Sequence, residues 1–325
     1  MFVVNDTPYC VWDFDIHQHN KAFIKSINHR YFEHLGKIHS AFLEEEDKQY
    51  AAIALRAAYS HALETLFALL GATLQAPDCV VGWVLKYRPE ELRGFVRKVV
   101  DRQKIYTKLS LTDTQWIEIV KATTPINSGD VEKIEKIHKN FAQLWTSFAE
   151  DFLDEDKTFE YNSIKHGLRV SMGGSFLAMG LQETLGVPAP AEKMRLLENS
   201  TFGSSFYVPE KFDKFNLRLK YHSLNWVPEN FIHALNLISM SIGNLLSFLK
   251  VFNNIEDEDT KFFYPSDETY FEEPWKRNVR VHHFSFASAI NIEDIAPLTT
   301  IPSPIRADWS PVGAGESVQG SSRCA

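Results

Sequence analysis

Cysteine is scarce in the sequence, where Cys10, Cys79 and Cys324 are the three among 325 residues. Their odd number, wide separation and lack of a Cys-x-x-Cys spacing exclude a disulfide framework and a zinc knuckle. This usage is typical of proteins that fold in a reducing compartment. We therefore predict a cytoplasmic location.

Long apolar stretches are also missing, since nowhere do eighteen apolar residues follow one another. The first eight residues include Asn5 and Asp6 and lack the basic start and apolar run of a signal peptide. We therefore expect neither a secretory signal nor a membrane span.

Positive charge is in deficit over the whole chain, which carries a net charge of −8 and has a pI near 5.9. That balance excludes a general coat of basic residues for nucleic acid, but it leaves room for a local basic patch. Residues 86–108 form such a stretch, with eight Lys or Arg against three acidic residues. They form either the solvated face of a helix or a docking site for an anionic partner such as RNA or a nucleotide.

Several catalytic motifs are absent, among them a Gly-rich phosphate loop, a Gly-x-Ser-x-Gly elbow and His-Glu-x-x-His. Glu135-x-x-His138 supplies half of the ligand pattern of a di-iron carboxylate protein. No second Glu-x-x-His occurs to complete that pattern. We therefore predict that the protein has no metal site and no cofactor.

Apolar residues recur at three- and four-residue steps over most of the chain, which predicts amphipathic helices. The two most apolar helices are expected over 44–76 and over 230–252, the second beginning at Pro228-Glu229. Further helices are expected over 16–46, 89–100, 113–120 and 131–154, and another should end near Gly167.

Strand patterns are confined to a short region after the helix that ends near Gly167. Residues 202–207 and 215–222 read as two strands of a β-ribbon, the second alternating apolar and polar residues. The segment 79–85 is either a short strand or a helical turn. The predicted fold class is mainly α, a helical bundle with a small β-ribbon insertion before the last long helix.

Composition divides the chain into four parts. We predict an N-terminal arm at 1–13 and a helical domain at 14–254, with the β-ribbon near 200–222. A C-terminal extension follows at 255–296, and the Pro, Ser and Gly content of 297–325 predicts a disordered tail. The long apolar helices must pack together, and they also predict a homodimer formed through them.

One polar stripe interrupts the apolar helix at 44–76. Arg56, Ser60 and Glu64 follow one another at four-residue steps, and His61 lies beside them. The stripe is either the solvent face of the helix or a buried polar cluster in which an arginine is paired with a glutamate.

The end of the helix near Gly167 brings together side chains that could take part in binding or catalysis. Lys165, His166 and Gly167 read as an ordinary helix end, with positive charge in the last turn and a left-handed glycine. Asn162, Lys165 and His166 also supply an amide, a fixed cation and a proton carrier, which could hold a phosphate and move a proton. If the helix continued, Arg169 would share their face. The sequence leaves both interpretations open.

This pattern resembles the HEPN (higher eukaryotes and prokaryotes nucleotide-binding) superfamily, which has many bacterial members. The family motif is an arginine, usually a polar residue next, and a histidine four to six positions after the arginine. Asn162 and His166 match the polar residue and the histidine, with Tyr161 at the arginine position, and Arg56-x-x-x-x-His61 has the same spacing. The resemblance implies a helical fold and, in many members, dimeric metal-independent ribonucleases of toxin or defence systems; other members are inactive scaffolds.

Two hypotheses follow. In the first, the chain is a non-catalytic binding or dimerisation module, and residues 162–167 serve as a helix cap. In the second, it is a metal-independent ribonuclease in which His166 is the acid or base, Lys165 and Arg169 or Arg56 hold the phosphate, and Asn162 orients the histidine.

Overall fold

The computed structural model describes residues 1–125, 130–181, 187, 189–211, 217–256, 260–267, 270–271 and 282–287. Helices account for most of these residues, so the predicted mainly helical class is confirmed. Residues 1–287 form one compact unit by their contacts, which includes the predicted arm 1–13. The predicted tail 297–325 and most of the predicted extension 255–296 lie outside the described residues.

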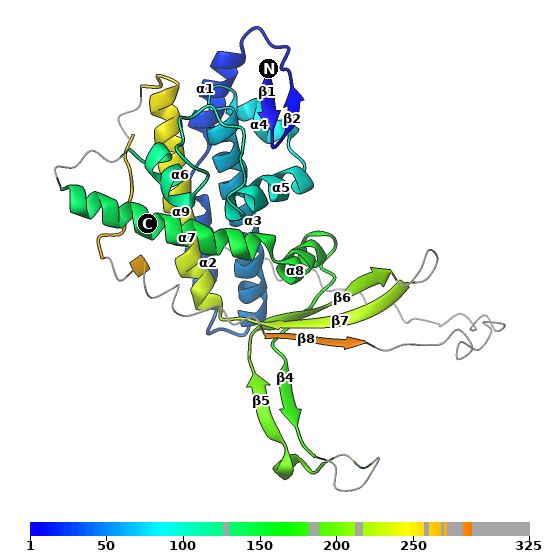
Figure 1. Ribbon diagram of the computed structural model, residues 1–325. Helices are drawn as coiled ribbons and strands as arrows, with labels where there is room; N and C mark the ends of the chain where they lie inside the picture. Colours follow the sequence, from blue (N-terminus) through cyan, green and yellow to red (C-terminus); the bar gives the residue numbers. More distant parts are fainter. Residues whose placement is uncertain are drawn as a thin grey trace, which may run out of the picture. The chain divides into compact units, whose positions relative to one another are not determined.

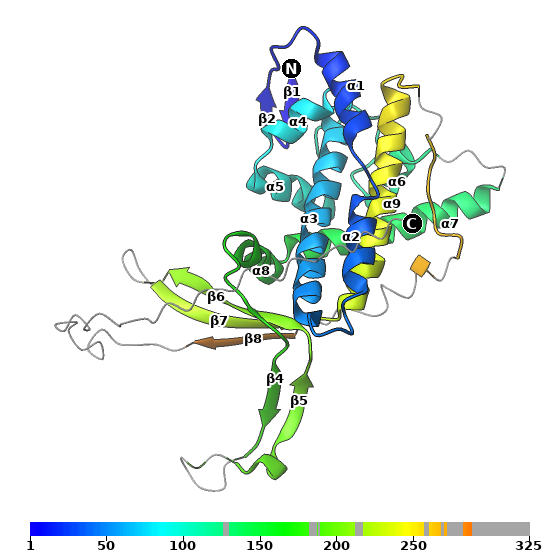
Figure 2. The same ribbon diagram turned by 180° about the vertical axis from the view of Figure 1, so that it is seen from behind.

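The core is built around α3 (Lys48–Gln75), most of whose residues are buried. It packs along α9 (Pro228–Phe252) and α2 (Tyr31–Ser40), and both views show the three helices side by side (Figures 1 and 2). A helix that is apolar on nearly all sides can only be stable when it is surrounded, which explains the central position of α3.

The last helix, α9, is also apolar. By length and composition α9 could cross a membrane, but 72% of its most apolar window is buried inside the structure. A hydrogen bond from the Trp145 indole to the Ser241 hydroxyl, 3.0 Å long, fixes it against α7 (Val131–Leu153). Burial of this kind identifies α9 as a core helix.

The single helix predicted over 16–46 is wrong. The chain instead forms α1 (Ile16–Ser26), turns at residues 27–30, and continues as α2. Ile27 is extended, and the Asn28 side chain accepts a 3.0 Å hydrogen bond from the backbone N–H of Arg30. Asparagine side chains compete with helical backbone hydrogen bonds in this way, so the helix stops although the apolar pattern continues.

Shorter helices surround the core. The ambiguous segment 79–85 forms α4 (Val80–Lys86), whose Trp83 ring lies so close to Gly71 that a Cβ there would be 2.5 Å from it. The helix predicted over 113–120 corresponds to α6 (Trp116–Thr123), which begins three residues later than predicted. The remaining helices are α5 (Pro89–Val100) and α8 (Glu155–Lys165).

Two helices of this region begin at aspartate caps. The Asp130 side chain accepts a hydrogen bond from the Lys133 N–H at the start of α7, and Asp154 accepts one from the Lys157 N–H at the start of α8, both 3.0 Å long. These contacts satisfy backbone donors that have no partner inside the helix. Asp154 also ends α7, so α8 follows α7 without a loop.

Strands occupy the region between α8 and α9 and both ends of the unit. An antiparallel sheet has the order β3-β6-β7-β8. Its strands β6 and β7 overlap the predicted ribbon strands 202–207 and 215–222, of which residues 215 and 216 lie outside the described residues. A separate hairpin, β4–β5, was not predicted. The bounds are β1 (Phe2–Val4), β2 (Thr7–Tyr9), β3 (Ser171–Met172), β4 (Phe176–Met179), β5 (Arg195–Asn199), β6 (Gly203–Lys211), β7 (Leu217–Asn225) and β8 (His282–Ala287).

Candidate functional site

A buried ion pair joins α3 to α8. The Arg56 side chain on α3 is 2% exposed, and Glu160 on α8 is fully buried. Arg56 Nε donates a 2.6 Å hydrogen bond to Glu160 Oε2, and Nη2 lies 2.5 Å from the same oxygen at an angle that makes no second hydrogen bond. The stripe on α3 therefore does contain a buried arginine, but its partner is Glu160 and not Glu64.

The second oxygen of Glu160 reaches into the β-region. Ser204 on β6 donates a 2.5 Å hydrogen bond to Glu160 Oε1, and the Trp226 indole N–H donates one of 2.9 Å. One carboxylate thus binds a guanidinium, a hydroxyl and an indole from separate parts of the chain. Burial would lower the pKa of the Arg56 guanidinium, but Glu160 more than offsets this and holds that pKa above its usual value.

Aromatic rings complete the surroundings of Arg56. The guanidinium carbon lies 5.3 Å from the centroid of the Phe231 ring and 5.8 Å from that of Tyr59. Cation–π contacts of this kind stabilise a desolvated arginine. Phe231 belongs to α9, so the arginine is held by α3, α8 and α9 together.

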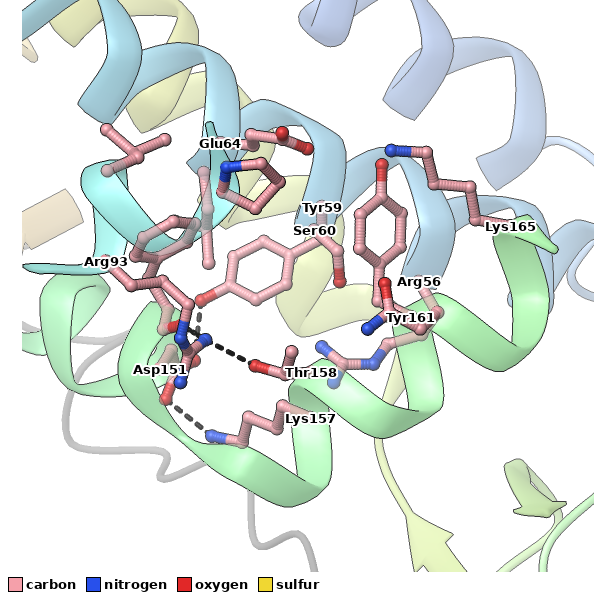
Figure 3. A pocket seen from close by; sticks show the side chains of 15 residues that line it. Arg56, Tyr59, Ser60, Glu64, Arg93, Asp151, Lys157, Thr158, Tyr161 and Lys165 are labelled. Atoms are coloured by element: carbon pink, nitrogen blue, oxygen red, sulfur yellow. Dashed lines mark hydrogen bonds and ion pairs between the residues drawn. The ribbon is translucent and has the colours of Figure 1, made fainter. Parts of the chain in front are cut away.

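A pocket of about 110 Å³ opens beside this ion pair, between α3, α5, α8 and the end of α7 (Figure 3). Its walls combine aliphatic and aromatic side chains with several charged ones. The lining residues are Arg56, Tyr59, Ser60, Leu63, Glu64, Pro89, Leu92, Arg93, Asp151, Phe152, Lys157, Thr158, Tyr161, Asn162 and Lys165.

Asp151 organises one wall of the pocket. Asp151 accepts two hydrogen bonds, both drawn in Figure 3. The Tyr59 hydroxyl donates one of 2.6 Å, and Lys157 Nζ donates one of 2.5 Å. Burial, and then the charge of Asp151, raise the pKa of the Tyr59 hydroxyl well above its usual value. Tyr59 is therefore a neutral hydrogen-bond donor.

Arg93 closes the end of α7 next to that wall. Its Nη1 donates to the Phe152 carbonyl at 2.7 Å and to the Thr158 hydroxyl at 2.5 Å, and Nη2 donates to the Leu153 carbonyl at 2.7 Å. The last carbonyls of a helix have no intrahelical donor, so the arginine satisfies them and complements the negative end of the helix dipole.

Tyr161 and Lys165 form the opposite side. Lys165 Nζ lies 5.6 Å from the centroid of the Tyr161 ring, and the lysine side chain is exposed. Burial, followed by the nearby charge of Glu64, raises the pKa of Tyr161 to about 12. Glu64 itself lies 3.4 Å from the Tyr87 hydroxyl. This side of the pocket therefore has one solvent-accessible cation beside an aromatic face.

The structure divides the predicted site residues into two groups. Arg56, Asn162 and Lys165 line the pocket, whereas His61, His166 and Arg169 are exposed and lie outside the lining. His61 contacts Phe32 edge-on, with ring centroids 5.2 Å apart. Desolvation lowers the pKa of its imidazole, Lys165 lowers it further, and Glu64 opposes both.

The predicted helix end is present at Gly167, whose φ of +102° requires glycine or a strained residue. The expectation that Arg169 could share a helical face with Asn162 and Lys165 fails, because α8 ends at Lys165. Past that point the backbone N–H groups of Leu168 and Arg169 bond back to the Ile164 and Ser163 carbonyls at 3.1 and 2.7 Å. These bonds satisfy two carbonyls of the last turn of α8.

Several residues of the site were not predicted from the sequence. They are the lining residues Tyr59, Arg93, Asp151, Lys157 and Thr158, and Glu160, which pairs with Arg56. One signal was available for Glu160. An arginine in the middle of an apolar helix requires a buried carboxylate, and Glu160 is an acid next to the candidate helix end. Its distance of 104 residues from Arg56 gives no local pattern.

The basic stretch 86–108 includes two lysines in ion pairs and one arginine that lines the pocket. Lys98 pairs with Asp6, and Lys108 Nζ lies 2.6 Å from Asp78 Oδ1. Arg93 enters the pocket. Six of its basic residues are exposed, namely Lys86, Arg88, Arg97, Arg102, Lys104 and Lys108.

Within the described residues, no three His, Cys, Asp or Glu side chains are grouped to hold a metal ion. His138, which belongs to the Glu-x-x-His pattern, is buried and its Nε2 lies 3.0 Å from the Thr124 carbonyl oxygen. That contact gives the histidine a structural role at the start of the α6–α7 connection.

Comparison with known proteins gave no match to any family model, curated protein or solved structure.

The buried ion pair predicts a strongly non-additive response to mutation. Glu160→Gln should lower the free energy of unfolding by about 3–5 kcal/mol, because the Arg56 charge stays buried without its carboxylate. The double variant Arg56→Met/Glu160→Leu should lower the free energy of unfolding by less than either Arg56→Met or Glu160→Leu alone. Urea denaturation measures both, with Glu118→Gln in the half-exposed Lys121–Glu118 pair as a control expected to cost under about 1 kcal/mol. Equal costs at Glu160 and Glu118 would refute the assignment.

Proposed function

We propose that the protein is a non-catalytic binding module whose pocket takes a small organic anion. The observation that supports this most is the charge of the lining, which contains Arg56, Arg93, Lys157 and Lys165 but only Glu64 and Asp151 as acids. Glu160 beneath the pocket neutralises Arg56, which leaves three cations against two acids in the lining. The chain as a whole carries a net charge of −8, so even this small local excess of cations runs against the composition. A concave, locally cationic site attracts negatively charged ligands.

The walls favour an anion with an apolar or aromatic body. Leu63, Leu92, Pro89 and Phe152 supply aliphatic and aromatic surface, and the Tyr161 ring stands beside Lys165. Hydroxyl and amide groups of Ser60, Thr158 and Asn162 add hydrogen-bonding positions. Ligand sites in proteins commonly combine an apolar surface with a few placed polar groups.

Lys165 is the cation that we expect to meet the charged end of the ligand. Arg56, Arg93 and Lys157 already bind carboxylates or carbonyls of the protein. Lys165 instead lies over an aromatic ring and is open to solvent, and Asn162 lies one helical turn before it. The two side chains can therefore contact a carboxylate or phosphate without breaking an internal ion pair.

Binding is a better account of this pocket than proton transfer. Its lining residues include no histidine or cysteine. The raised pKa values of Tyr59 and Tyr161 make both hydroxyls poor bases near neutral pH, and Asp151 is engaged by two donors. We propose a helical bundle with a β-ribbon before its last long helix as the scaffold, and a cytoplasmic location from the cysteine usage.

Calorimetric titration with three probes tests the proposal. Adenosine 5′-monophosphate and benzoate carry both a ring and an anion and should bind, whereas inorganic phosphate alone should bind more weakly. Lys165→Met should weaken binding of the first two by roughly tenfold, since a charge-assisted contact is lost. Lys104→Met, an exposed lysine outside the pocket, is the matched control and should have no effect. Failure of every probe, or an equal effect of both variants, would contradict the proposal.

The HEPN-like ribonuclease is the alternative proposal, and the presence of Asn162, Lys165 and Arg56 around one pocket is the observation in its favour. Against it, His166 is exposed at the end of α8 and outside the lining. The binding proposal predicts no cleavage of a mixed RNA pool in EDTA by the wild type or by His166→Ala. Cleavage by the wild type that disappears in His166→Ala, with unchanged circular dichroism, would establish the ribonuclease instead.

A further inference from the structure

Four of the six charged side chains that line the pocket already have strong partners within the protein. Arg56 is paired with Glu160, and Arg93 donates to three acceptors around the end of α7. Lys157 Nζ lies 2.5 Å from Asp151 Oδ1. A ligand that used these side chains would have to break contacts that hold the fold together.

The two charged side chains that remain in the lining are Glu64 on α3 and Lys165 on α8. Glu64 Oε1 lies 3.4 Å from the Tyr87 hydroxyl, which is longer than a typical hydrogen bond between two oxygens. Lys165 Nζ lies over the Tyr161 ring. Neither Glu64 nor Lys165 forms an ion pair with any residue that the structure describes. The pocket therefore offers a ligand one acid and one base.

These two charges are at the same end of the pocket (Figure 3). Lys165 Nζ is 5.6 Å from the centroid of the Tyr161 ring, and the charge of Glu64 contributes to the raised pKa of the Tyr161 hydroxyl. Both charges also act on the imidazole of His61, with opposite effects on its pKa. A positive group that meets Glu64 and a negative group that meets Lys165 can therefore belong to one small molecule.

The volume of the pocket limits the size of that molecule. About 110 Å³ is room for roughly ten water-sized groups, since a bound water takes about 10–15 Å³ on the same scale. A single amino acid is of this size. The aliphatic and aromatic surface of Leu63, Pro89, Leu92 and Phe152 suits an apolar side chain on it.

On the basis of the proposed function, we infer that the bound anion is the carboxylate of an amino acid with an apolar side chain, whose ammonium group meets Glu64 while the carboxylate meets Lys165. A ligand with both charges satisfies both side chains at once. An anion without an ammonium group would instead desolvate the Glu64 carboxylate and give it no partner. The charge-assisted contact at each end therefore selects the zwitterion over a molecule that has one of the two charges.

Calorimetric titration with L-phenylalanine, 3-phenylpropionate and 2-phenylethylamine tests this assignment. The three probes share a phenyl ring on a short chain. The second probe lacks the ammonium group, and the third lacks the carboxylate. The wild type should bind L-phenylalanine at least roughly tenfold more tightly than either analogue, because each analogue loses one charge-assisted contact.

Glu64→Gln separates the two ends of the ligand. The variant should bind L-phenylalanine roughly tenfold more weakly, but it should not bind 3-phenylpropionate more weakly, because that probe has no ammonium group. Retained binding of 3-phenylpropionate also shows that the pocket of the variant is folded. The matched control is Glu46→Gln, which changes an exposed glutamate outside the pocket and should bind all three probes like the wild type.

Two results would overturn the amino-acid assignment and leave the anion site intact. One is equal binding of L-phenylalanine and 3-phenylpropionate by the wild type, and the other is an equal effect of Glu64→Gln on these two probes. A wild type that binds neither probe would also contradict the assignment. The proposed function is then decided separately by titration with adenosine 5′-monophosphate and benzoate, which carry no ammonium group.

Discussion

A buried arginine is the constraint on which the arrangement of this fold depends. Arg56 lies buried in the first half of the central helix, where its charge would strongly destabilise the fold without a partner. Glu160 supplies the partner from α8, and its second oxygen binds Ser204 on β6 and Trp226 just before α9. A single carboxylate therefore joins the helical core, the sheet and the last helix, and α8 has to lie where Glu160 can reach all of them.

The position of α8 determines the pocket. Lys157, Thr158, Tyr161 and Lys165 lie on the same helix as Glu160, so fixing the carboxylate places these side chains opposite α3 and α5. A further contact, 3.2 Å between His222 Nδ1 on β7 and Asp156 Oδ1, links the same helix to the sheet. One helix, α8, therefore lines the candidate ligand site and also connects the helical core to the sheet.

Elements determined by local residues could be predicted from the sequence, and contacts between distant residues could not. The bounds of α7 and α9 and the end of α8 follow from Asp130, Pro228 and Gly167, which act on their own neighbourhood. The break between α1 and α2 was missed because the side chain of Asn28 outweighs an uninterrupted apolar pattern. Arg56, Asn162 and Lys165 were identified as site residues. The role of Glu160 depends on a contact across 104 residues. The β4–β5 hairpin depends on a pairing of strands separated by residues 180–194, whose glycines and prolines predict a loop.

The most direct test is to measure how much Ser204→Ala lowers the free energy of unfolding in two proteins, the wild type and the double variant Arg56→Met/Glu160→Leu. In the wild type the change removes a donor from a buried carboxylate and should lower the free energy of unfolding by about 1–3 kcal/mol. In Arg56→Met/Glu160→Leu no carboxylate remains for the hydroxyl to bind, so the same change should cost close to nothing. Equal costs in the two backgrounds would show that Glu160 does not couple the sheet to the helical core.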